Sequence, residues 1–274
     1  MATKYDRIAA DLRAKIRDGD LAPGDQMPAE TVLKETYRVS LVTMRRALDL
    51  LAAEGLIEKR HGHGTFVRIP RQHVKRTSER HQWEKDRVLL PLDRRYGTGS
   101  TERDTGLEMP DLEFHAEYNE IIADQDLAKA FGVPTGTRLL ERTYRTRPRS
   151  EPAPFGLGHS YLLYDMVAVN PDLIDVTKEP WPGGTQHQLF TIGIELDRIV
   201  EEVTARPPSA DEAEELGIDV GVAVLVLRKT SIDTDGRVVE VSDSVLAGDR
   251  TQLSYTIELK RWPLAERRRA EKGL

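Results

Sequence analysis

The sequence predicts a two-part α+β chain, in which a mostly helical N-terminal segment ending in a β-hairpin precedes a body of antiparallel strands and short helices. Three observations support this prediction. Apolar residues recur at helical spacing three times within residues 4–55. Two β-prone runs, LIEKR and TFVRI, enclose the turn HGHG. From residue 111 onward strands alternate with short helices, which is typical of an α+β body.

In the N-terminal segment, the spacing of apolar residues predicts helices over residues 4–18, 30–37 and 40–55. Gly19 is a suitable stop for the first helix, and Ser40 is a suitable N-cap for the third. Only two residues separate the second helix from the third, as in a helix-turn-helix, and the following hairpin would form a wing. The predicted N-terminal unit is therefore a winged helix-turn-helix.

The start of the third helix is polar and basic, with Ser40, Thr43, Arg45 and Arg46 in its first turns. Recognition helices use hydroxyls and guanidiniums near their N-termini to reach phosphates and base edges in the major groove. An isolated arginine pair usually just solvates a helix face. Here the order of helix, turn, polar helix and hairpin favours DNA contact.

The stretch RHGHGTFV, residues 60–67, is compatible with a metal site, a phosphate-binding loop, a plain hairpin turn or a turn that touches DNA. No carboxylate or third histidine lies near it in sequence, which disfavours a metal. A strand follows the glycines where a phosphate-binding loop needs a helix. A tight turn is therefore expected, and neither a metal nor a cofactor is predicted for the chain.

Composition narrows the class of protein further. The chain lacks cysteine, which excludes disulfides and a thiolate nucleophile and suits a reducing compartment. Its charged N-terminus has no apolar run of a signal peptide, and its longest apolar run, VAVLVL, is too short for a membrane span. Residues 1–76 hold 15 Lys and Arg against 10 Asp and Glu, whereas the rest holds 25 against 36. A cytoplasmic protein with a basic head and an acidic body is expected.

The run DQMPAETVLKETYRVSLVTMRRALDLLAAEGLIEKRHGHGTFV resembles the DNA-binding domain of GntR-type bacterial transcription regulators, and the similarity covers most of residues 5–68. The resemblance implies that the start of the third helix contacts the major groove and that the wing tip enters the minor groove. The resemblance and the polar start of the third helix together predict a set of DNA-contacting residues. They are Glu30, Thr31, Ser40, Leu41, Val42, Thr43, Arg45, Arg46, His61, Gly62 and His63.

Two positions depart from the family pattern. Thr31 and Leu41 each replace an arginine that commonly reads bases, and a bidentate arginine–guanine contact carries about 1–3 kcal/mol of discrimination. We therefore expect an operator that differs from the family's usual GT…AC half-sites. Leu41 or Val42 would offer apolar contact to a thymine methyl group.

The C-terminal body contains an internal repeat, because residues 126–145 and 212–231 share a short helix, two glycines four positions apart and an apolar strand. This half resembles the UTRA effector domain of the HutC subfamily over about residues 112–260. The resemblance implies a chorismate-lyase-like fold that binds a small molecule and dimerises. The effector residues that it implies are Arg145, Arg147, Thr185, His187 and Glu240, while Gly158 stands where family members carry a glutamate.

The expected organisation is a winged head at 1–70, a linker at 71–110, an effector-binding and dimerisation domain at 111–262 and a basic tail at 263–274. The linker segment could instead be an ordered excursion packed on the body. The expected function is that of a homodimeric regulator, most simply a repressor, that binds a palindromic DNA operator under control of a small molecule. One alternative is a repressor whose body only dimerises. The other is an enzyme on the chorismate-lyase-like fold, which lacks support because no Ser-His-Asp spacing, HExxH or P-loop occurs.

Overall fold

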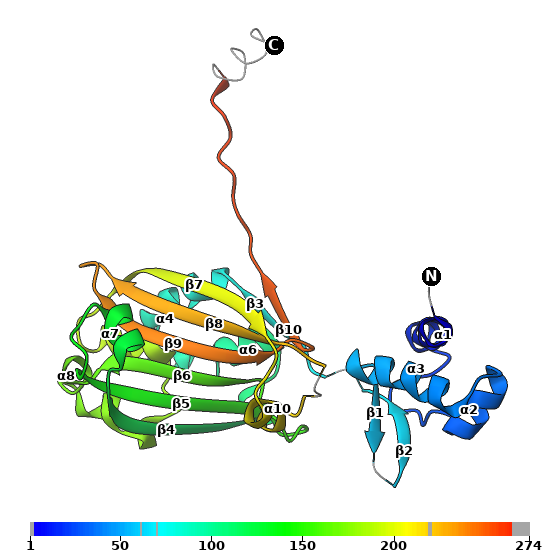
Figure 1. Cartoon of the computed structure of the whole chain (residues 1–274). Coiled ribbons are helices and arrows are strands. Elements are labelled where there is room, and N and C mark those ends of the chain that lie inside the picture. Colours follow the sequence, from blue (N-terminus) through cyan, green and yellow to red (C-terminus); the bar gives the residue numbers. More distant parts are fainter. Residues whose placement is uncertain (1–2, 61, 70, 219–220, 265–274) are drawn as a thin grey trace.

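The computed structural model describes residues 3–60, 62–69, 71–218 and 221–264, and its N-terminal unit is the predicted winged helix-turn-helix (Figure 1). Its elements are α1 (Lys4–Asp18), α2 (Glu30–Thr36), α3 (Leu41–Ala53), β1 (Ile57–Arg60) and β2 (Gly64–Val67). Thr3 and Asp6 form a capping box at the start of α1, and Gly19 ends that helix at φ 87°. The predicted apolar stripe of α3 is confirmed, since Met44 and Leu51 are fully buried against α1.

The C-terminal body is built on a six-stranded sheet in the order β4-β5-β6-β9-β8-β7, with every neighbouring pair antiparallel. The strands are β4 (Leu112–Ile122), β5 (Arg138–Pro148), β6 (Gly156–Leu163), β7 (Leu196–Arg206), β8 (Val224–Asp233) and β9 (Val238–Ala247). The pairing of β6 with β9 joins the two halves of the body into one sheet. The predicted antiparallel α+β architecture is thus confirmed.

The internal repeat corresponds to two similar helix–strand units. Asp124 and Ser209 cap α7 (Gln125–Phe131) and α10 (Ala210–Leu216), and each helix ends at a glycine with positive φ. Each helix precedes a long central strand, β5 or β8. The two helices pack on the same face of the sheet near its opposite ends (Figure 1).

The segment 71–110, expected to be a linker, is ordered and packs on the body. It contains β3 (Val74–Thr77), α4 (Glu79–Val88), α5 (Leu92–Arg95), α6 (Ser100–Thr105) and η1 (Met109–Asp111). Strand β3 pairs in parallel with β10 (Thr251–Ser254), near the end of the described chain. Because β3 pairs with β10 and α4 packs on α9 (Gly184–Phe190), the segment is part of the body, and the expectation of a linker is corrected.

The remaining elements, together with α4–α6, cover the second face of the sheet, which lies behind it in Figure 1. They are α8 (Tyr164–Val167), η2 (Pro171–Ile174), η3 (Val176–Lys178) and α9 (Gly184–Phe190). After β10 the chain runs out from the body as an extended segment (Figure 1). Within the described ranges, no helix is both long and apolar enough to cross a membrane.

Candidate functional site

The N-terminal end of α3 presents the polar surface that the sequence predicts. Ser40 caps the helix by accepting a hydrogen bond from the Thr43 amide at 3.2 Å, and the two hydroxyl oxygens lie 2.9 Å apart. Val42, Arg45 and Arg46 are exposed on the first two turns. The helix start therefore offers hydroxyls, guanidiniums and one apolar side chain to a partner at this surface.

Residues of α2 and α3 meet at this surface through one ion pair. The Arg45 Nε donates to Glu30 Oε2 at 2.7 Å, while Thr31 beside it is exposed and Leu41 is half-buried. The structure thus brings the predicted residues of the two helices onto one side of the head. The carboxylate of Glu30 orients Arg45 without burying it.

The wing is a short hairpin in which β1 and β2 pair from Ile57–Val67 to Arg60–Gly64. Gly62 and Gly64 have φ of 76° and 112°, conformations that favour glycine. His63 is exposed, and its carbonyl accepts a hydrogen bond from Gln26 at 3.0 Å, which ties the wing to the loop before α2. His61 lies outside the described residues. Among the described residues no group of histidines or carboxylates could hold a metal ion.

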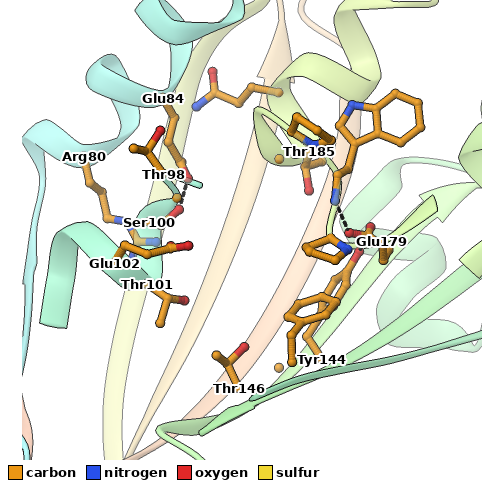
Figure 2. A pocket seen from close by; sticks show the side chains of 18 of the residues that line it. Arg80, Glu84, Thr98, Ser100, Thr101, Glu102, Tyr144, Thr146, Glu179 and Thr185 are labelled. Carbon is orange, nitrogen blue, oxygen red and sulfur yellow. Dashed lines mark hydrogen bonds between the residues drawn. The ribbon is translucent and has the colours of Figure 1, made fainter. Parts of the chain in front are cut away.

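The body contains a partly open cavity of about 570 Å³ between the sheet and the α4–α6 layer (Figure 2). Its floor consists of alternate residues of the four central strands, including Tyr144, Gly158, Leu227, Ser242 and Ser244. Three of these five residues are glycine or serine, whose small side chains leave space above the middle of the sheet. A space of this size is within the usual range for a small-molecule site.

Helices α4, α6 and α9 close the cavity opposite the sheet and at one side. Arg80 and Glu84 come from α4, Ser100 and Thr101 from α6, and Thr185 from α9, as Figure 2 shows. Ser100 donates a hydrogen bond to Glu84, which joins α6 to α4. The segment that was expected to be a linker therefore supplies one wall of the cavity.

Beside the cavity, on the same face of the sheet as Tyr144, lies a buried polar network centred on Arg142, which is 1% exposed. Its guanidinium donates to Gln188 at 2.5 Å, to Ser160 at 2.9 Å and to Thr185 at 3.1 Å. It also lies 3.5 Å from Glu240. The network connects β5, β6 and β9 to α9 and so fixes the cavity wall.

Glu240 remains charged within this network. Burial alone would raise its pKa, but Lys229, whose Nζ lies 2.9 Å away, and Arg142 lower the pKa to about 2. Ser160 and Ser231 donate to its two oxygens at 2.8 and 2.9 Å. A buried carboxylate with this many partners is compensated, as buried charges must be.

A second cluster surrounds Glu179 at the β4–β5 side of the cavity. Tyr144 donates to one of its oxygens at 3.0 Å and Gln188 at 3.1 Å, and Tyr118 donates to the same oxygen. The Trp181 amide donates to the other oxygen at 2.7 Å. Burial raises the pKa of Tyr144 well above its usual value, so its hydroxyl stays a donor at neutral pH. Glu179 therefore fixes the orientation of the aromatic wall.

Two arginines lie at the β7–β8 side of the cavity. Arg76 of β3 and Arg80 of α4 both line it, and Arg80 pairs with Asp104 at 2.7 Å. The closest carboxylate oxygen to Arg76 belongs to Glu201 at 3.9 Å, and that oxygen already bonds His81 at 3.0 Å. Burial and the charge of Arg80 lower the pKa of Arg76 to about 10.

Two of the predicted effector residues do not reach the cavity. Arg145 bonds Glu215 of α10, and Arg147 donates to Glu113 of β4 at 2.7 Å. Side chains alternate along a strand, so these arginines share the face opposite to Tyr144 and line no part of the cavity. The predicted clamp by this pair is corrected for that reason.

The other predicted effector residues lie at or beside the cavity. Thr185 and Glu240 line it, and Gly158 forms part of its floor. His187 lies behind the wall, where its Nδ1 accepts a hydrogen bond from Trp181 Nε1 at 2.9 Å. The structure therefore places Thr185 and Glu240 at the cavity. His187 contacts the cavity only through Trp181, and the two arginines lie outside it.

Sequence reasoning missed Arg76, Arg142, Glu179 and Trp181. Arg142 carried a usable signal, because strand periodicity places it on the same face as Tyr144. The turn-rich motif EPWPGG that contains Glu179 and Trp181 could have indicated a shaped loop. Arg76 gave no comparable signal, since its role depends on the pairing of β3 with the distant β10.

Comparison with known proteins agrees with this architecture. Residues 4–67 match the family described as bacterial regulatory proteins, gntR family, and residues 115–252 match the UTRA domain. An HTH-type transcriptional regulator of Streptomyces coelicolor is 30% identical over 269 residues, covering 94% of each chain. The transcriptional repressor NagR of Bacillus subtilis is 24% identical over 247 residues, covering 90% of this chain and 91% of its own. A crystal structure of a GntR-family transcriptional regulator covers 94% of this chain and 98% of its own, with a TM-score of 0.64 and 27% identity.

A winged head joined to an α+β body with a partly open cavity is typical of transcription regulators that combine a DNA-binding head with a UTRA domain. The chain belongs to the GntR family of bacterial regulators and carries a UTRA domain. Its full-length relatives named above are regulators rather than enzymes.

Proposed function

We propose that the chain is a cytoplasmic, homodimeric repressor of the HutC subfamily, whose binding to a palindromic operator is controlled by a small molecule in the cavity. One observation carries the proposal. The segment of residues 71–110 follows the head directly in the chain, and its helices α4 and α6 form one wall of the cavity. A repressor is favoured over an activator because NagR, a full-length relative, is named a repressor. Two-fold symmetry of a dimer would match the palindrome.

Contacts at the junction support a route from the cavity to the head. Gln72 follows the wing by a few residues and donates from its side chain to the carbonyl of Thr105, the last residue of α6, at 2.9 Å. Its amide donates to Glu151 at 3.3 Å, and its carbonyl accepts from Arg250 at 3.1 Å. Because α6 lines the cavity, a ligand that shifts α6 would move Gln72 and change the position of the head.

The DNA half of the proposal is tested by sequencing host genomic fragments that the purified chain retains at one fixed salt concentration. We expect a short inverted repeat upstream of a few genes. Arg45→Gln should retain those fragments weakly, whereas Arg198→Gln, an exposed change on β7, should retain them fully. Uniform weak retention of all fragments that fades with salt would contradict sequence-specific binding.

The cavity half is tested by filling the floor at Gly158. A Cβ there would meet only Tyr144, at 3.6 and 3.7 Å, which is ordinary contact, so Gly158→Leu should fold while occupying part of the space. We expect this variant to repress an operator–reporter fusion in the host under growth conditions that release the wild-type chain. Equal release of both proteins would contradict a ligand site over Gly158. Repression by the wild-type chain that persists under every growth condition would indicate that the body only dimerises.

A further inference from the structure

The guanidinium of Arg76 is a half-buried cation that makes no hydrogen bond within the described part of the chain. Its side chain is 18% exposed and lines the cavity, and its shortest ion-pair distance is the 3.9 Å to Glu201. A guanidinium offers five donors, and those of Arg76 that face the cavity are free to bind an acceptor of a ligand. The Nε of neighbouring Arg80 also lacks a hydrogen-bond partner among the described residues. This wall therefore presents donors that a ligand acceptor would satisfy.

The opposite wall is apolar and aromatic. Phe114 of β4 and Tyr144 of β5 have ring centroids 5.8 Å apart, and Trp181 lines the same side. Pro180 and Pro182 extend this surface beside Trp181. Flat, rigid side chains of this kind favour a ring or another compact apolar body by stacking and burial.

Charges around Arg76 limit the charge of the ligand. Burial raises the pKa of Glu84, but Arg80 and the hydrogen bond from Ser100 lower it more, so this carboxylate is ionised at neutral pH. Glu201 is likewise ionised. Burial raises its pKa, but the contact with His81 and the charges of Arg76 and Arg80 together lower it more. Glu84, Glu201 and Asp104 already offset the charges of Arg76 and Arg80, so no surplus positive charge remains here for the second negative charge of a dianion such as phosphate. A single planar carboxylate also matches the two-pronged geometry of one guanidinium.

We propose that the cavity binds a monocarboxylate with an aromatic or alicyclic body, its carboxylate on Arg76 and its ring against Phe114, Tyr144 and Trp181. The proposal deepens the proposed effector site and rests on it. The small floor residues Gly158, Ser242 and Ser244 leave the space between the two walls for the ligand to span. The carboxylate would supply the acceptor that Arg76 lacks.

The test uses three probes with one ring and different head groups: phenylacetate, phenylacetamide and phenyl phosphate. Their affinities for the full chain are measured by isothermal titration calorimetry without DNA. We expect phenylacetate to bind at least roughly tenfold more tightly than phenylacetamide, because a hydrogen bond to a charged group contributes about 1.5–3 kcal/mol. Phenyl phosphate should bind more weakly than phenylacetate. Equal affinities of acid and amide, stronger binding of phenyl phosphate, or no binding of phenylacetate would each overturn the proposal.

Two variants assign the effect to Arg76. Arg76→Gln should remove the preference for the acid over the amide. Arg149→Gln changes an exposed guanidinium at the cavity rim, which donates to the Pro110 carbonyl at 3.0 Å, and should keep the preference. If Arg76→Gln fails to fold, the wild-type comparison of acid and amide still decides the ligand class. Since no DNA is present, failure here together with retention of an inverted repeat would overturn the ligand class and leave DNA regulation intact.

Discussion

At the polar end of α3, Arg45 differs from its neighbour Arg46 in one respect: its Nε is held by Glu30 at 2.7 Å. The ion pair is exposed, so it contributes little to stability, but it limits the orientations of Arg45. An arginine that is oriented before binding loses less conformational freedom on contact with DNA.

We expect Arg45→Gln to weaken operator binding and to reduce the slope of log affinity against log salt by about 1, if Arg45 neutralises one phosphate. The measurement is fluorescence anisotropy with the retained operator over a range of salt concentrations. Arg198→Gln, on the body, should leave both affinity and slope unchanged. A slope unchanged in Arg45→Gln, with lost discrimination at one base pair, would instead assign Arg45 to a base contact.

His187 gives the cavity wall a pH dependence. Burial, and then the charge of Arg95, lower the pKa of His187, which matches its role as acceptor for the Trp181 indole. Between the lowered folded pKa and the unfolded value of about 6.5, the unfolded chain binds more protons. The contribution of His187 is therefore complete above about pH 6.5 and is lost as the pH falls below it.

We expect the free energy of unfolding of the wild-type body to fall between neutral pH and about pH 5, and His187→Asn to show a smaller fall. Asparagine keeps an acceptor near the indole but does not titrate in this range. Urea unfolding followed by tryptophan fluorescence at a series of pH values provides the measurement. Parallel pH profiles for the two proteins would exclude His187 as the titrating group.

Among the helices, α3 shows how a local signal in sequence can be sufficient. Ser40 was identifiable as an N-cap because a hydroxyl residue precedes a helical apolar pattern, and the structure confirms its bond to the Thr43 amide. Ser78 precedes α4 in the same way but makes no side-chain cap bond. The two serines form a matched pair.

Ser40→Ala should lower the free energy of unfolding of the head by about 1 kcal/mol through the lost cap. Ser78→Ala should change the stability of the chain by no more than about 0.5 kcal/mol. Thermal unfolding followed by circular dichroism compares the two variants with the wild type. An equal loss of stability in both would show that the capping bond of Ser40 has no specific effect.

The segment 71–110 shows where sequence reasoning reaches its limit. Its polar composition resembles that of a linker, yet α4 is held by tertiary contacts. Arg103 of α6 lies on the ring of Trp83 at 4.8 Å, and Gln186 of the distant α9 donates to the His81 carbonyl at 3.0 Å. The pairing of β3 with β10 joins residues far apart in sequence. Local patterns carry no record of such contacts, because helix and strand preferences are weaker than tertiary packing.

The same limit applies to the faces of β5. The two-residue period correctly groups Arg145 with Arg147, and Arg142 with Tyr144. It does not say which group faces the cavity, because that depends on where α4, α6 and α10 pack. The winged head, the sheet and the repeat were therefore predictable, while the cavity residues were predictable only in part.

At the scale of the whole molecule, the described C-terminal segment is an exposed apolar surface that the proposed DNA and ligand sites do not explain. Tyr255, Ile257, Leu259, Trp262 and Leu264 are each more than half exposed. The segment continues β10 away from the body as extended chain (Figure 1). Five large apolar side chains within ten exposed residues are typical of a surface that binds a partner. In the proposed homodimer, two such segments related by the two-fold axis would each pack on the other copy.

We expect a chain that stops after Ser254 to dimerise at least about a hundredfold more weakly, because fully burying one large apolar side chain contributes about 1.5–3 kcal/mol. Sedimentation equilibrium of the full and shortened chains measures this difference. Glu258→Gln with Lys260→Gln, which keeps all five apolar side chains, should dimerise like the wild type. An unchanged dimer in the shortened chain would place the interface on the sheet or helices instead. A monomeric wild-type chain would contradict the homodimer itself, and with it the match between two heads and a palindromic operator.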